Sequence, residues 1–145
     1  MSGTFTTSMA RNIFFGGTVF FLLVFLALTY QNEQIIPQRD QRAMLKANPA
    51  IAAGKKLWET NQCIGCHTLL GEGAYFAPEL GHVVQRLGSK EAVMAFIQSR
   101  PKEGIPGRRR MPQFNFTEKQ LKEIADFLEY AGKINTAKWP PNIQG

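Results

Sequence analysis

The longest pattern in the chain is an apolar stretch near the N-terminus, from Ile13 to Tyr30. Its 18 residues carry no charge, and as a helix they would extend about 27 Å, close to the roughly 30 Å hydrocarbon thickness of a bilayer. A cleaved signal peptide is the alternative, but its apolar region is usually shorter and its start more basic than the single Arg11 found here. The nearest cleavage candidate, Ala27-Leu28-Thr29, is poor. We therefore expect residues 1–32 to form a cytoplasmic N-terminus and a retained transmembrane anchor.

Beyond this stretch, polar segments alternate with patterns of helical period. Residues 33–47 are polar, contain Pro37, and are expected to form a connector that is partly helical. Asn48 followed by Pro49 is typical of a helix start. The apolar positions of the helix that follows are Ile51, Leu57 and Trp58.

Two further helices are predicted on the same grounds. Ser89 is expected to cap a helix over residues 90–99. The last helix begins with the capping box Thr117-x-x-Gln120 and is expected to end at Gly132 as its C-cap. Their apolar positions are Val93, Met94 and Ile97 in the first, and Leu121, Ile124, Ala125, Phe127, Leu128 and Tyr130 in the second. No strand pattern or repeat interrupts the series, so the predicted fold class is all-α, with one transmembrane helix followed by a helical domain over residues 48–145.

The clearest chemical motif is Cys63-Ile64-Gly65-Cys66-His67, which is the attachment signature of a c-type haem. The spacing places the two sulfurs close to the separation of the porphyrin vinyl groups, to which they add as thioethers. His67 then follows at the position where an imidazole can ligate the iron. One motif predicts one covalently bound haem c, attached through Cys63 and Cys66, with His67 as the proximal axial ligand.

Three other uses of the cysteines compete with this interpretation. A thioredoxin-like redox pair needs a βαβ context, which the pattern lacks. A zinc site needs at least one more thiolate, yet the chain has 2 cysteines and only His82 could join His67. A disulfide between Cys63 and Cys66 would leave His67 unexplained.

Met111 lies in a proline-flanked loop well downstream of the motif. Because a His/Met pair is the usual axial set of electron-transferring cytochromes c, Met111 is predicted to be the distal iron ligand. Ordinary packing of Met111 and ligation by His82 instead are the alternatives, and a surface or hydrogen-bonding role suits His82 better. An iron with both axial positions filled binds no substrate, so we expect outer-sphere electron transfer and no catalysis by this chain alone.

The chain is basic, with a formal charge of +6 and a pI near 9.6. Its basic residues are scattered and no nucleic-acid-binding motif is present, so a nucleic-acid partner is not expected. A surface for an acidic partner, or pairing with haem propionates or lipid headgroups, explains the charge better. Arg108, Arg109 and Arg110 beside Met111 are candidates for steering an acidic donor, with solvated loop charges as the alternative.

Charge alone gives an ambiguous membrane orientation. Arg11 precedes the apolar stretch, whereas Arg39, Arg42 and Lys46 follow it, which is the reverse of the usual positive-inside bias. Thioether attachment takes place on the non-cytoplasmic side of bacterial membranes, and a long translocated domain weakens the charge rule. We therefore expect a single-pass protein of the inner membrane with its haem domain in the periplasm.

The order of these features resembles a class I cytochrome c. Gly54 and Trp58 precede the cysteine motif, and a loop methionine and an amphipathic helix follow it. The resemblance implies that the first and last helices of the domain cross where Gly54 permits close contact. It also implies that Trp58 meets the Leu128/Tyr130 region.

A narrower resemblance extends over nearly the whole chain. Four stretches are similar to the small cytochrome c subunit of bacterial cytochrome c-dependent nitric oxide reductase, and the run from Thr68 to Leu80 is the most specific. The stretches are Met9 to Gly17, Cys66 to Leu80, Pro106 to Phe114 and Trp139 to Pro141.

This resemblance implies a role in an enzyme complex. The chain would accept electrons from soluble periplasmic cytochromes c or cupredoxins and pass them to a large multi-helix subunit with haem b and a haem b3/non-haem iron centre, where NO is reduced to N2O. It also implies a calcium ion shared with that subunit and bound in part by oxygens of Gly73 and Tyr75, for which a tight packed loop is the alternative. A free-standing anchored shuttle, the cytochrome c subunit of a haem-copper oxygen reductase, and a gas sensor or peroxidase remain as other functions.

Overall fold

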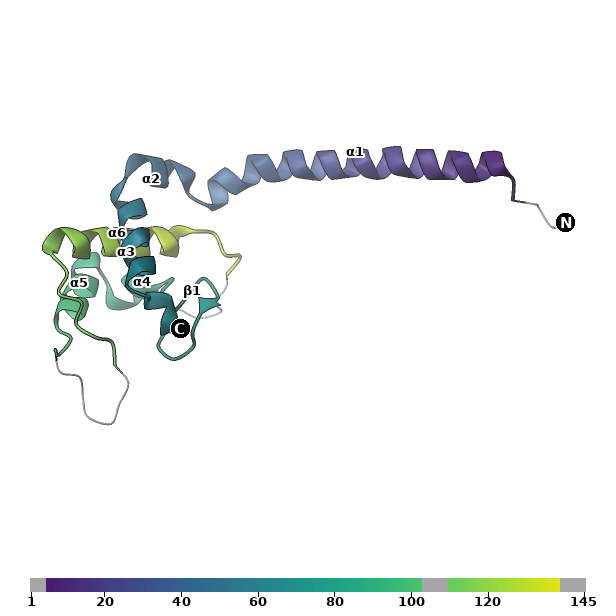
Figure 1. Ribbon diagram of the computed structural model, residues 1–145. Helices are drawn as coiled ribbons and strands as arrows, with labels where there is room; N and C mark the ends of the chain where they lie inside the picture. The colour runs from purple at the N-terminus through teal and green to yellow at the C-terminus, as the bar shows by residue number, and fades with distance from the viewer. Residues whose placement is uncertain (1–4, 103–109, 139–145) are drawn as a thin grey trace. The chain divides into compact units, whose positions relative to one another are not determined.

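The computed structural model describes residues 5–102 and 110–138, and these residues are mostly helical (Figure 1). The chain divides into two compact units, Met1–Gln38 and Arg39–Gly145. The predicted all-α class, with one N-terminal apolar helix ahead of a helical domain, is confirmed. In chain order the elements are α1 (Thr7–Arg39), α2 (Arg42–Ala47), α3 (Ala50–Thr60), the 3-10 turn η1 (Cys63–Gly65), β1 (Thr68–Leu69), β2 (Glu72–Gly73), α4 (Val83–Leu87), α5 (Lys90–Gln98) and α6 (Glu118–Lys133).

Helix α1 is long and apolar enough to cross a membrane, and none of its residues is buried. It continues past Tyr30 to Arg39, through the first part of the segment expected to be a connector. The residues after Tyr30 include glutamine and glutamate, which are good helix formers. Pro37 lies in the last turn, where its missing N–H removes only one helical hydrogen bond.

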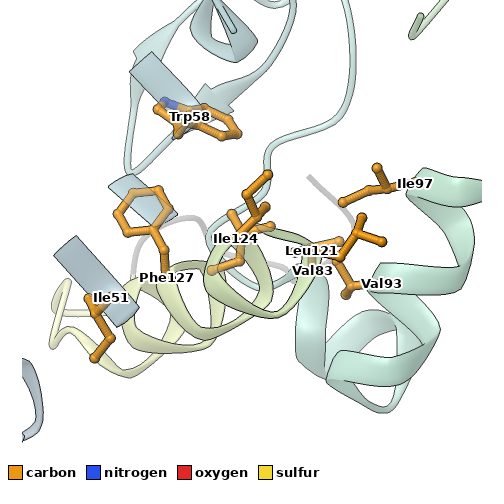
Figure 2. Packing of buried hydrophobic residues seen from close by; sticks show 9 residues of the cluster. Ile51, Trp58, Val83, Val93, Ile97, Leu121, Ile124 and Phe127 are labelled. Carbon is orange, nitrogen blue, oxygen red and sulfur yellow. The ribbon is translucent and has the colours of Figure 1, made fainter. Parts of the chain in front are cut away.

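The second unit is built around α6, which packs against α3, α4 and α5. In Figure 2 the apolar side chains of α3 gather round Phe127, and those of α4 and α5 gather round Leu121. The predicted capping box is present, because Thr117 accepts from the Gln120 backbone while the Gln120 side chain accepts from the Thr117 backbone. The buried cluster consists of Ile51, Trp58, Val83, Val93, Ile97, Leu121, Ile124, Phe127 and Leu128.

The other predicted helix starts also carry caps. Ser89 accepts a hydrogen bond from the Ala92 amide at the start of α5, as expected. Asn48 Oδ1 accepts from the Ala50 amide at 3.0 Å, so the Asn48-Pro49 pair does begin α3.

Glycines permit close approach of the backbone at two helix contacts. A Cβ on Gly54 would collide with the backbone oxygen of Glu123 and lie 2.8 Å from Phe127 Cβ, which confirms Gly54 as the point where α3 and α6 cross. Gly132, predicted to end α6, lies inside the helix, which continues to Lys133. The C-cap prediction was therefore wrong; a side chain at Gly132 would lie 2.6 Å from Gly81 O, so this glycine permits close packing instead.

A small hairpin follows the cysteine motif, where the sequence showed no strand pattern. Thr68 pairs with Gly73, and Leu69 pairs with Glu72, in antiparallel register. Leu70 and Gly71 form the two-residue turn with positive φ angles of 53° and 89°, the backbone conformation that tight hairpins favour. Each strand has two residues, too few for an alternating apolar pattern to be visible.

A buried carboxylate joins three helices. Asp126 on α6 is 1% exposed and accepts from Lys90 Nζ at 2.7 Å and from Asn48 Nδ2 at 3.3 Å. Burial alone would raise the pKa of Asp126, but the hydrogen bonds from Lys90 and Asn48, with the charges of Lys90 and Lys122, outweigh it and hold this pKa below its ordinary value. The start of α3, the start of α5 and the middle of α6 are thus tied at one point.

Candidate functional site

The cysteine motif folds into a compact turn. Cys63 O accepts hydrogen bonds from the Cys66 amide at 3.2 Å and from the His67 amide at 3.0 Å. The turn brings both thiols and the His67 imidazole to the lining of one cavity of about 260 Å³. The three side chains that the sequence singled out therefore converge.

An apolar slot lies against this turn. The cavity that holds both thiols adjoins a second one of about 270 Å³. Trp58, Ile124 and Leu128 line the second cavity, so the slot extends to the core at α6. Such a space suits a flat apolar macrocycle with one edge toward solvent. The residues shared by the two cavities are Cys63, His67, Pro78, Phe96, Met111 and Phe114.

The His67 ring is oriented by a backbone carbonyl. His67 Nδ1 lies 2.7 Å from Pro78 O. A carbonyl oxygen only accepts, so Nδ1 carries the proton and the lone pair is left on Nε2. This is the usual arrangement for a histidine that ligates a metal through Nε2. No sequence signal marked Pro78 for this role beyond its place in the loop after the motif.

Buried Glu79 fixes the loop that supplies this carbonyl. Glu79 is 6% exposed; its Oε1 accepts from the Leu70 amide at 2.9 Å and its Oε2 from the Gly81 amide at 2.7 Å. Arg86 Nη2 donates to Glu79 O at 2.9 Å. The loop is thereby held against the hairpin, and Glu79 is a positioning residue rather than a group that faces water.

Met111 lines both cavities, as does His67, and packs against the buried cluster. Met94 also packs on that cluster but lines neither cavity. His82, the rival ligand, lies at the start of α4, and within the described residues it is absent from the lining of both cavities. Met111 is therefore the thioether that accompanies His67 at the slot.

The geometry disfavours the other uses of the cysteines. Cys63 and Cys66 form no disulfide with each other, and burial raises the pKa of the Cys63 thiol to about 11. Reactive redox thiols and zinc thiolates instead have depressed pKa values. Among the described residues no group of three or more His, Cys, Asp or Glu side chains could hold a metal ion.

Trp58 partly meets its expected neighbours. Its ring centroid lies 6.2 Å from that of Phe127 and 6.5 Å from that of His67. Trp58 also lines the slot together with Leu128, as expected. The Tyr130 hydroxyl makes a different contact, because it donates a hydrogen bond to Asp40 O at 2.7 Å.

Three described arginines lie in, or next in sequence or space to, the residues that line the slot. Arg86 lines it, and the Arg100 guanidinium lies 3.8 Å over the ring of Phe96, itself a lining residue. Arg110 directly precedes Met111, and burial together with the charge of Arg100 lowers the pKa of Arg110. Arg108 and Arg109, also predicted for this rim, lie outside the described residues, as does the Trp139–Pro141 stretch.

The two residues implied in calcium binding lie on the surface. Gly73 in β2 is exposed and has a φ of 117°, and Tyr75 is 80% exposed. Calcium takes six to eight oxygen ligands. These two residues could supply only part of such a set.

An apolar slot with two thiols, an oriented histidine and a methionine is typical of a carrier of haem c, and the long apolar helix α1 fits a membrane anchor. The family model for cytochrome c matches residues 51–132. Over its full length the chain is 54% identical to a nitric oxide reductase subunit of Stutzerimonas stutzeri and 45% identical to the corresponding subunit of Paracoccus denitrificans, with 100% of each relative covered. The corresponding subunit of Cereibacter sphaeroides is 40% identical, again over 100% of both chains. The chain therefore belongs to the cytochrome c family and, within it, to the family that these nitric oxide reductase subunits form.

Proposed function

We propose that this chain is the electron-transfer subunit of a membrane-bound nitric oxide reductase. The observation that supports this most directly is the apolar slot in which Cys63, Cys66, His67 and Met111 meet. In this proposal Cys63 and Cys66 would hold haem c through thioethers, and His67 and Met111 would ligate its iron. When bound, the haem supplies a one-electron iron centre.

The protein residues set the conditions for that transfer. Pro78 O keeps the His67 proton on Nδ1, so Nε2 stays available for the iron. Trp58, Ile124 and Leu128 exclude water from the inner part of the slot, and a low local dielectric disfavours the more highly charged oxidised iron. Met111 raises the reduction potential relative to a second nitrogen ligand. With both axial positions occupied, the chain passes electrons and does not itself reduce NO.

The proposed partner is the large catalytic subunit with haem b and a haem b3/non-haem iron centre. Soluble periplasmic cytochromes c or cupredoxins are the proposed donors, and the haem domain lies in the periplasm with the N-terminus cytoplasmic. A calcium ion shared with the partner would use oxygens of Gly73 and Tyr75, with the remaining ligands coming from the partner. The relatives' names, each of which describes a subunit of nitric oxide reductase, support the assembly.

A free-standing shuttle fits the chain less well. It would need a long flexible connector between anchor and haem domain, whereas α1 itself continues to Arg39. The next residue, Asp40, already accepts a hydrogen bond from Tyr130. The division predicted from the sequence, with an anchor over 1–32 and a connector over 33–47, stays a prediction.

The attachment residues can be tested by haem spectroscopy of the full-length chain. Cys66→Ala should leave one vinyl group unreacted, which shifts the pyridine haemochrome band away from that of the wild type. Ile64→Ala is the matched control, because Ile64 lies inside the same motif and its side chain is 39% exposed. An unshifted band in Cys66→Ala would refute the assignment.

A further inference from the structure

Arg110 carries donors that nothing in the described structure satisfies. Its Nε and Nη1 atoms are buried and have no hydrogen-bond partner among the residues described. A guanidinium cannot lose its proton in a protein, so its charge cannot be removed to relieve this situation. Buried donors without acceptors are costly and rare, which indicates that an acceptor other than the described residues belongs here.

The surroundings of Arg110 indicate that the acceptor is an anion. Arg100 is close enough to act on Arg110 electrostatically, so two like charges lie near each other at this rim. The Arg100 guanidinium is already engaged, since its Nε donates to Phe96 O at 3.1 Å and its Nη2 to Ser99 Oγ at 3.1 Å. Arg86 donates to Glu79 O. Arg110 therefore differs from its two neighbours in having open donors.

The slot itself offers no counter-charge. The described residues that line its two cavities include no aspartate or glutamate. Met111, the residue after Arg110, lines both cavities, so the chain at Arg110 runs directly into the slot lining, although Arg110 itself is not among the described lining residues. The group that the proposed function assigns to the slot carries two propionate carboxylates, and paired N–H donors of arginine match a carboxylate in geometry and charge.

We propose that Arg110 Nε and Nη1 bind a haem propionate and hold it ionised beside Met111. This inference rests on the proposed function, because it needs haem in the slot. It assigns Arg110 the role of a cofactor-binding residue, separate from the residues that attach the haem and ligate its iron. The carboxylate satisfies the two orphan donors and offsets the repulsion between Arg100 and Arg110.

The expected consequence is a reduction potential that depends on Arg110. A fixed positive charge near the haem disfavours the oxidised iron, so Arg110→Gln should lower the potential. The propionate then lacks its partner, so it takes up a proton more readily, and proton uptake becomes coupled to the iron oxidation state. We expect the redox equilibrium of Arg110→Gln to shift about tenfold at high pH, which is about 59 mV for one electron, and the difference to shrink as pH falls.

The test is potentiometric titration of the haem-loaded full-length chain in detergent, from pH 5 to pH 9. Wild type should show a flat profile, Arg110→Gln a potential that falls with rising pH, and Arg110→Lys an intermediate slope. Arg100→Gln is the matched control, because it removes the same charge from a guanidinium that already has partners. It should lower the potential by a similar amount at every pH.

A flat profile in Arg110→Gln would overturn the proposal. It would mean that Arg110 in the wild type uses another acceptor, such as Gln113 Oε1, which is also buried and without a partner among the described residues. Should Arg110→Gln fail to take up haem, the Arg110→Lys profile and the infrared carboxylate bands of the wild type decide the question. A wild type whose propionate bands show a protonated carboxyl at pH 7 would equally refute it. A pyridine haemochrome spectrum of the wild type tests the proposed function separately. Absence of haem c would refute the proposed function, whereas haem c with a flat Arg110→Gln profile would refute only the role of Arg110.

Discussion

At the scale of single residues, the site depends on contacts made by backbone atoms far along the chain. Pro78, 11 residues after His67, supplies the carbonyl that determines which imidazole nitrogen is free. Glu79 holds that carbonyl's loop through two backbone amides. The His67 imidazole is therefore oriented by a backbone carbonyl, whose loop is held in turn by a buried carboxylate.

The assignment of Met111 predicts the result of a ligand exchange. Met111→His should lower the reduction potential, because a nitrogen ligand favours the oxidised iron more than a thioether does. The fall should be a sizeable part of the roughly 0.8 V over which axial ligands tune haem potentials. Potentiometric titration measures it. Met94→Leu is the control, since Met94 packs on the core and lines neither cavity; equal potentials in wild type and Met111→His would argue against ligation by Met111.

Sequence predicted which side chains line the slot better than it predicted the contacts that hold them there. The features that the sequence revealed are local patterns that depend on residue type and spacing. They are the five-residue motif, Met111 and the caps at Ser89 and Thr117. The roles of Pro78 and Gly132 depend on contacts between distant segments, which a local pattern does not encode. Gly132 illustrates this limit, because glycine near a helix end commonly signals a cap, yet here it admits Gly81 O.

At the scale of secondary-structure elements, the crossing of α3 and α6 brings the haem motif and the core together. Gly54 lies at that crossing, and Trp58, one turn further along α3, reaches the slot. A side chain at position 54 would separate the helices and so widen the slot. Because Gly54 and Trp58 lie one turn apart on α3, the packing of α3 against α6 at Gly54 also determines where Trp58 lies in the slot.

Replacing the glycine at this crossing should be strongly destabilising. In Gly54→Ala the new methyl group collides with backbone of α6, which cannot move aside as a flexible side chain could. We expect a loss of at least about 3 kcal/mol in the free energy of unfolding, at the upper end of overpacking effects. Thermal or denaturant unfolding of the haem-loaded chain measures it. Lys56→Ala, at an exposed position of the same helix, should change stability by less than about 0.5 kcal/mol; similar losses in both variants would contradict the crossing.

The junction at Asp126 predicts a pH-dependent effect on stability. The pKa of Asp126 is below its ordinary value in the folded chain, so its contribution is present above the unfolded pKa and is lost as pH falls through the lower folded pKa. Asp126→Asn should therefore reduce the free energy of unfolding by about 2 kcal/mol at pH 7. The difference from wild type should begin to shrink below about pH 4, near the ordinary pKa of an aspartate, and disappear below the lower pKa of the folded chain.

Denaturant titrations at several pH values test this junction. Glu59→Gln is the control, because the Glu59 carboxylate pairs with Lys55 on the surface with 61% exposure, and exposed pairs contribute little. A difference between Asp126→Asn and wild type that stays constant from pH 7 to pH 3 would show that the charge of Asp126 is not what joins the helices.

At the scale of the whole molecule, the two compact units have separate tasks. α1 contributes no buried residue, while the core cluster comes from residues between Ile51 and Leu128. The anchor is therefore not needed to complete the core of the second unit. Membrane attachment and electron transfer depend on different stretches of the chain.

Removing the anchor should release a soluble haem protein. A variant containing residues 39–145 behind a cleavable export signal should carry covalent haem c and appear in the soluble periplasmic fraction, because its core is complete. Fractionation with haem staining measures this, and the full-length chain in the membrane fraction is the control. Aggregated or haem-free product would show that α1 supports folding or haem attachment and would contradict the proposed division.

The measurement that tests the account most directly is purification of the full-length chain through a tag in mild detergent, followed by pyridine haemochrome and metal analysis. The account predicts haem c together with haem b, iron in excess of the haem content, and a large hydrophobic partner that consumes NO. Haem c alone in a small monodisperse protein, or a partner that contains copper, would contradict it.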